Sequence, residues 1–200
     1  MRPARLVSWL LVLLAWTLVA QPASAPAADE EQLFEALRTG RAAALLRHAL
    51  APGTGDPAGF RLDDCATQRN LSAAGRDQAR GIGERLRGQG IAQAQVYSSQ
   101  WCRCLETARL LELGAVKELP ALNSFFGDRA SAGAQTAALK DFLNSGTGAA
   151  PVVLVTHQVN IAALTGQGAR SGEIVVVALP FEDEGSVLGW IAPRDGTPAD

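Results

Sequence analysis

The order of strand-like and helix-like segments constrains the fold of this 200-residue chain more than any other feature. Short apolar runs predict strands at residues 42–46, 95–99, 116–122, 151–156, 173–179 and 186–191. Between them, apolar residues at helical spacing predict helices at residues 29–38, 72–86, 101–113, 130–143 and 159–164. A repeated strand-then-helix order is typical of a mostly parallel sheet with helices on both faces. We therefore expect an α/β protein, a three-layer α/β/α sandwich with a mostly parallel central sheet, whose last two strands form an antiparallel edge hairpin.

The first 27 residues have the pattern of an export signal. Arg2 and Arg5 precede an apolar core at residues 6–20, and small residues offer cleavage frames at 23–25 and 25–27. The second frame is favoured because the first leaves a proline just after the cut; an uncleaved signal anchor is the alternative. We expect a periplasmic or secreted protein that meets the membrane only through this segment before cleavage. Residues 28–200 then form a single domain, since about 170 residues are too few for two full-sized ones.

The charge and the cysteines of the chain indicate which partners, disulfides and metal sites to expect. Loss of Arg2 and Arg5 takes the formal net charge from −2 to −4, so no broad basic surface is expected and nucleic acid is not a predicted partner. Export permits disulfides, and Cys65 is expected to pair with either Cys102 or Cys104, because cysteines two apart on a helix point in different directions. The third cysteine stays free or pairs between chains. A metal site is disfavoured because the Cys-x-Cys spacing is not that of zinc sites.

The two histidines of the chain are the main functional signal, because each lies where an apolar strand-like run ends. His48 follows the run at residues 43–46 and Arg47, and His157 follows the run at 151–156. Imidazole suits nucleophilic or proton-transfer chemistry near neutral pH, and functional sites gather at strand ends in α/β sheets. The arginine directly before His48 indicates a phosphate ligand.

Four ordered segments resemble the histidine phosphatase superfamily, whose fold is phosphoglycerate-mutase-like. They are Leu45-Leu46-Arg47-His48-Ala49; Arg69-Asn70-Leu71-Ser72 with Gly75 and Gln78-Ala79; Ser98-Ser99 with Arg103 and Thr107-Ala108; and Thr156-His157. The resemblance implies that His48 is a nucleophile that forms a phosphohistidine, that Arg47 and Arg103 bind the phosphoryl oxygens, and that His157 donates a further hydrogen bond. It implies no cofactor and no metal.

Several further residues are candidates for contact with substrate. Arg69 and Asn70 either line the phosphate pocket or cap and anchor the helix that begins near Ser72. Asn160, shortly after His157, and Glu173, at the start of the fifth strand, are also candidate substrate-binding residues.

The sequence departs from the family pattern at two positions. Ala49 replaces the usual glycine after the first histidine, and Gln158 stands where one branch of the family has an aspartate after the second. An amide cannot donate a proton to a leaving alkoxide, so Asp128 is the first candidate for the general acid and Glu173 the second. The alternative for Asp128 is an ordinary surface position. Without an acid, phosphoramidates, acyl phosphates or pyrophosphates are favoured as substrates.

Two functions follow. The first is an exported phosphatase that hydrolyses phosphate monoesters or related phosphoryl compounds through a phosphohistidine. The alternative is a non-catalytic or weakly catalytic binder of phosphate or phosphorylated envelope components. In either case the partner is a phosphorylated small molecule or envelope component. We expect the loops at residues 51–68 and 123–133 to form the side of the pocket that contacts the leaving group. Phe60, Phe125 and Phe126 are candidates for an apolar wall there.

Overall fold

The computed structural model describes residues 29–146, 148 and 150–193, so the expected export signal lies outside the described residues. A six-stranded sheet has the order β3-β2-β4-β1-β5-β6. The strands are β1 (Ala42–Arg47), β2 (Gln95–Ser98), β3 (Val116–Glu118), β4 (Val152–Thr156), β5 (Ile174–Ala178) and β6 (Val187–Ile191). The helices are α1 (Glu30–Arg38), α2 (Ala73–Gly88), α3 (Cys102–Leu110), α4 (Ala132–Asn144) and α5 (Gln158–Thr165). None of these described helices is long and apolar enough to cross a membrane.

The sheet is mostly parallel, which confirms the expected architecture. Strands β1 to β4 run parallel to one another, and β5 runs antiparallel between β1 and β6. The predicted antiparallel pair is therefore present, with β6 at the sheet edge and β5 joined to the central strand β1. Arg47 is the register partner of Thr156, so the residues that follow β1 and β4 leave the sheet side by side.

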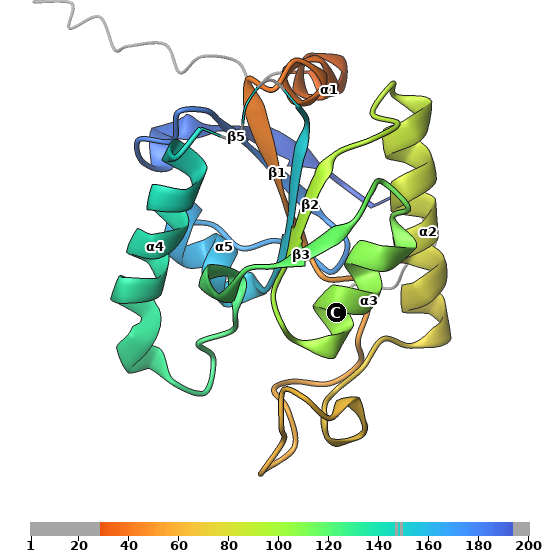
Figure 1. Ribbon diagram of the computed structural model, residues 1–200, viewed down its shortest axis with the longest axis vertical. Coiled ribbons are helices and arrows are strands. Elements are labelled where there is room, and N and C mark those ends of the chain that lie inside the picture. The colour runs from red at the N-terminus through yellow and green to blue at the C-terminus, as the bar shows by residue number, and fades with distance from the viewer. Residues whose placement is uncertain (1–28, 147, 149, 194–200) are drawn as a thin grey trace, which may run out of the picture.

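The alternation of side chains along the strands creates two apolar layers. Ala44 and Leu46 of β1 face a core shared with α1, α2 and α3, whereas Ala43 and Leu45 face a core shared with α4 and α5. Figure 1 shows α2 and α3 on one side of the sheet and α4 and α5 on the other. Because residues two apart on a strand share a face, one short apolar run supplies both cores.

Two elements differ from the sequence prediction. The third strand ends at Glu118, because Pro120 lacks an N–H for the sheet and begins a 3₁₀ turn at Pro120–Leu122. Helix α3 ends at Leu110, earlier than the predicted residue 113, and its N-cap is Trp101 without a side-chain hydrogen bond. Ser72 caps α2, since its hydroxyl accepts a hydrogen bond from the N–H of Gly75 at 3.0 Å.

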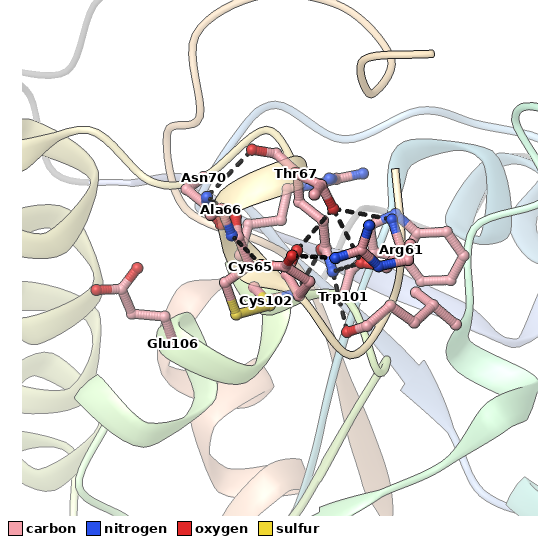
Figure 2. Close-up of a disulfide and its surroundings, with 12 residues drawn as sticks. Arg61, Cys65, Ala66, Thr67, Asn70, Trp101, Cys102 and Glu106 are labelled. Atoms are coloured by element: carbon pink, nitrogen blue, oxygen red, sulfur yellow. Dashed lines mark hydrogen bonds and ion pairs between the residues drawn. A yellow bond between two sulfur atoms is a disulfide. The ribbon is translucent and has the colours of Figure 1, made fainter. Parts of the chain in front are cut away.

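A disulfide joins Cys65 to Cys102 (Figure 2). This confirms the expectation that Cys65 pairs with one of the two helical cysteines, and Cys104 is free and buried. The bridge ties the long loop between β1 and α2 to the first residue of α3. Among the described residues, no group of three or more histidine, cysteine, aspartate or glutamate side chains is placed to hold a metal ion.

Candidate active site

A pocket of about 190 Å³ lies where β1 and β4 end. His48 and His157 are the first residues after these two strands, and the N–H of His48 donates to the carbonyl of Thr156 at 3.0 Å. The two imidazole rings are 5.5 Å apart between centroids and meet edge to face. Side chains from both strand ends, α3 and two loops line the pocket: Arg47, His48, Asp56, Arg69, Arg103, Ser124, Phe126, His157 and Gln158.

A backbone hydrogen bond fixes the protonation state of the His48 ring. Nδ1 lies 2.8 Å from the carbonyl oxygen of Ala49, which can only accept, so Nδ1 carries the proton. Nε2 of the neutral ring then has a free lone pair. Burial, together with the positive charge of Arg103, holds the pKa of His48 well below its usual value. The ring is therefore neutral near pH 7, which is the state that a nitrogen nucleophile requires.

His157 is held by a second set of partners. The guanidinium of Arg103 can only donate, so its Nη2, 3.4 Å away, donates to Nδ1 of His157. Nε2 of His157 then donates to the hydroxyl of Ser99 at 2.8 Å, and that hydroxyl donates to the Asn123 side chain. Burial and the neighbouring His48 and Arg103 lower the pKa of His157 well below its usual value. Its neighbours thus define the orientation of this ring as well.

Three arginines place positive charge around the histidines. Nη1 of Arg47 donates to Oε1 of Gln158 at 2.9 Å and to the carbonyl of Ala169 at 3.0 Å. Arg69 donates to the carbonyls of Gly55 and Ala51 in the loop that follows β1. Guanidinium groups stay charged at any physiological pH and match the geometry of phosphoryl oxygens, so the arrangement suits a phosphate dianion.

Residues of the predicted motifs also hold the backbone beside His48. The N–H of Ala49 donates to the hydroxyl of Thr107 at 3.0 Å, and the N–H of Leu50 donates to the side chain of Gln78 at 2.9 Å. The methyl group of Ala49, which replaces the usual glycine hydrogen, is fully buried and packs with Leu71 and Ala79. The alanine is therefore accommodated without loss of the site geometry.

Four of the candidate site residues do not line the pocket. Asp128 is exposed on its loop, so the structure does not support the expectation that it donates a proton there. The carboxylate of Glu173 accepts hydrogen bonds from the backbone and the side chain of Arg170, and Glu173 is not among the residues that line the pocket. Asn70 donates to the carbonyls of Cys65 and Gln68 and thus braces the loop (Figure 2). Asn160 donates to the carbonyl of Asn123 at 2.8 Å, and this bond anchors a loop.

The structure adds two residues that the sequence did not single out for the site. Asp56, in the loop after β1, is the one carboxylate among the residues that line the pocket. Ser99, the second serine of the Ser98-Ser99 motif, contacts His157 directly. Of the three candidate wall residues, Phe126 lines the pocket and is 46% exposed, whereas Phe125 is buried and Phe60 packs against Trp101.

Comparison with known proteins agrees with this arrangement. Residues 44–128 match the family model described as histidine phosphatase superfamily (branch 1). No curated protein matches the chain. Among solved structures, the protein histidine phosphatase SixA complexed with tungstate is 23% identical, with a TM-score of 0.53 over 76% of this chain and 97% of that chain. Phosphoserine phosphatase from Entamoeba histolytica, in complex with 3-phosphoglyceric acid, is 14% identical, with a TM-score of 0.56 over 76% and 98%.

A mycobacterial glucosyl-3-phosphoglycerate phosphatase with inorganic phosphate is similar to the same extent, at 19% identity and a TM-score of 0.53 over 76% of this chain and 94% of that chain. At these identities the likeness shows the fold, and the family match adds the segment that carries His48, Arg69 and Arg103. The chain therefore has the phosphoglycerate-mutase-like fold of these phosphatases, and its residues 44–128 match the histidine phosphatase superfamily, which supports a phosphoric ester hydrolase.

Proposed function

We propose that the chain is an exported phosphatase that transfers a phosphoryl group from its substrate to Nε2 of His48. The neutral ring attacks phosphorus, the N–P bond forms and the bond to the leaving group breaks. Water then attacks phosphorus, the N–P bond breaks and inorganic phosphate leaves. The proposal rests on one observation above all: the carbonyl of Ala49 holds the proton on Nδ1, and Nε2 remains as the nucleophile in a pocket lined by Arg47, Arg69 and Arg103.

A trapping experiment tests this mechanism. Brief incubation with a ³²P-labelled substrate, followed by alkaline quenching, is expected to leave label that is stable in base and lost in acid, as a phosphohistidine is. The His48→Ala variant is expected to retain no label, whereas Asp128→Asn, at an exposed loop position outside the pocket, is expected to label as wild type does. Equal labelling of the His48→Ala variant would exclude His48 as the nucleophile.

The substrate class that we propose has a leaving group that needs little protonation. Asp56 is the one carboxylate among the described residues that line the pocket, and it is ion-paired to Arg103, so none of these residues is a carboxylic acid placed to protonate an alkoxide. Acyl phosphates avoid this need because their leaving group is a carboxylate, and phosphoramidates, including phosphohistidine, can take the proton on the leaving nitrogen from solvent. The similar fold of a protein histidine phosphatase supports the same class.

We expect kcat/KM for phosphoramidate or acetyl phosphate to exceed that for glycerol phosphate by about 100-fold or more, since general acid catalysis typically contributes that much. Steady-state rates measured at one pH give the comparison. Equal values for the three substrates would show that a proton donor operates in the pocket.

The same observation favours a second candidate function, a binder of phosphate or of phosphorylated envelope components that turns over slowly or not at all. Calorimetric binding of inorganic phosphate without hydrolysis of esters, acyl phosphates and phosphoramidates would establish it. For either function the N-terminal pattern and the Cys65–Cys102 bridge support a periplasmic or secreted location. Recovery of the protein only from the cytoplasm of its native cell would contradict export.

A further inference from the structure

Asp56 makes four hydrogen bonds in the wall of the pocket. Its side chain is 8% exposed and forms a two-point ion pair with Arg103, with Nη1 2.7 Å from Oδ1 and Nη2 3.2 Å from Oδ2. The indole N–H of Trp101 donates to Oδ2 at 3.0 Å, and the backbone N–H of Arg69 donates to Oδ1 at 3.0 Å. The carboxylate thus joins the loop that follows β1 to the first turn of α3.

These contacts keep Asp56 ionised. Burial alone would raise the pKa of its carboxyl group, but the hydrogen bonds and the charge of Arg103 outweigh burial and hold the pKa below its usual value. A carboxylate of this kind accepts hydrogen bonds and has no proton to give near neutral pH. Its contribution to the reaction must therefore pass through the groups that it holds.

The ion pair leaves one edge of the Arg103 guanidinium for a ligand. A guanidinium has an end edge, formed by Nη1 and Nη2, and a side edge, formed by Nε and Nη2. Asp56 occupies the end edge. On the side edge, Nη2 lies 3.4 Å from Nδ1 of His157, and Nε is buried without a hydrogen-bond partner among the described residues. An orphaned buried donor costs stability unless a ligand satisfies it.

We propose that Asp56 is a positioning residue, which holds Arg103 by its end edge so that the side edge binds the oxygens of the phosphoryl group beside His157. This inference rests on the proposed function, in that it assigns the phosphoryl site to the same pocket. It explains why a negative charge lies in a site built for an anion. Asp56 neutralises only the edge of Arg103 that faces away from the reacting group.

Binding of inorganic phosphate to the full chain, measured by calorimetry, tests the inference without turnover. The near-isosteric Asp56→Asn variant is expected to weaken phosphate binding about tenfold or more, because an amide cannot hold both ends of the guanidinium. The matched control is Asp63→Asn in the same loop, whose side chain is 89% exposed, and wild-type affinity is expected there. Asp56→Asn is also expected to raise KM by a similar factor for substrates with different leaving groups.

A double-mutant cycle separates positioning from a merely structural role. If Asp56 acts through Arg103, adding Asp56→Asn to Arg103→Ala is expected to cost no further phosphate affinity. Where Asp56→Asn does not fold, Trp101→Phe removes one donor to the same carboxylate and is expected to weaken phosphate binding to a smaller extent. Wild-type affinity in a folded Asp56→Asn variant, or additive losses in the cycle, would overturn the inference. If the Asp56→Asn variant loses phosphate binding but the wild type traps no phosphohistidine, the inference about Asp56 is upheld and the proposed function is refuted.

Discussion

The protonation state of His48 depends on a single backbone carbonyl. The carbonyl of Ala49 accepts a hydrogen bond from Nδ1–H of His48, and Thr107 and Gln78 hold this segment through the N–H groups of Ala49 and Leu50. These two side chains come from α3 and α2, which explains why motif residues far from His48 in the sequence matter to its chemistry. The nucleophile is thus defined by the backbone around it.

The two histidines of the chain make their protonation directly measurable. Since burial and nearby arginines lower both pKa values, both rings are expected to be neutral at pH 6.5, where an ordinary histidine is half protonated. As the pH falls, protonation is expected only well below that value. Ring ¹⁵N NMR of an untagged protein is expected to show two neutral rings, with the His48 proton on Nδ1, and a His157→Gln variant assigns the signals. A ring that titrates near pH 6.5 would contradict the buried geometry.

At the scale of the elements, close packing of helix α2 depends on two glycines. A Cβ at Gly75 would lie 2.0 Å from the carbonyl oxygen of Leu50, and one at Gly83 would lie 2.2 Å from that of Leu111. The first contact brings α2 against the segment that follows His48, and the second brings it against the end of α3. Backbone atoms cannot move aside as the end of a flexible side chain can, so no larger residue fits at either position.

Alanine substitutions along α2 test this packing. Gly75→Ala and Gly83→Ala are each expected to lower the free energy of unfolding by about 2 kcal/mol or more, the usual cost of overpacking. Gly81→Ala is the matched control on the same helix, because a Cβ there meets nothing within 4 Å, and it is expected to raise stability by up to about 1 kcal/mol. Urea unfolding gives the values. Equal effects at the three glycines would mean that helix propensity, and not close packing, selects glycine on α2.

The elements and the central side chains of the site were predictable from the sequence, because they follow local rules. Apolar runs gave the six strands, and His48 and His157 lie together because they follow adjacent parallel strands. Contacts between distant loops follow no local pattern. Nothing in the sequence distinguishes Asp56, which reaches Arg103 across 47 positions, from the exposed Asp63. For the same reason, the sequence indicated Asp128 as the general acid only because it lies on the loop expected beside the pocket, and the structure places it outside the residues that line the pocket.

At the scale of the whole molecule, the disulfide ties the long loop between β1 and α2 to the start of α3, and both of these segments contribute residues to the pocket. Cys65 lies in the loop that carries Asp56, and Cys102 precedes Arg103 at the start of α3 (Figure 2). The N–H of Cys102 also donates to the side chain of Gln68, next to Arg69. The long loop, orange in Figure 1, otherwise extends away from the sheet. The bridge therefore limits the positions that this loop can take relative to the histidines.

Removal of the bridge is expected to destabilise the protein by about 3 to 4 kcal/mol, because the closed loop spans 37 positions and an open chain gains conformational entropy on unfolding. Cys65→Ser, Cys102→Ser and the reduced wild type are expected to share this loss in urea unfolding, since each lacks the same covalent link. Cys104 is buried and burial raises the pKa of its thiol to about 12, so it is expected to resist alkylation in the folded protein. The Cys104→Ala variant is the control, and it is expected to keep its sensitivity to reductant. A free energy of unfolding that reductant leaves unchanged would show that the bridge does not restrain the loop.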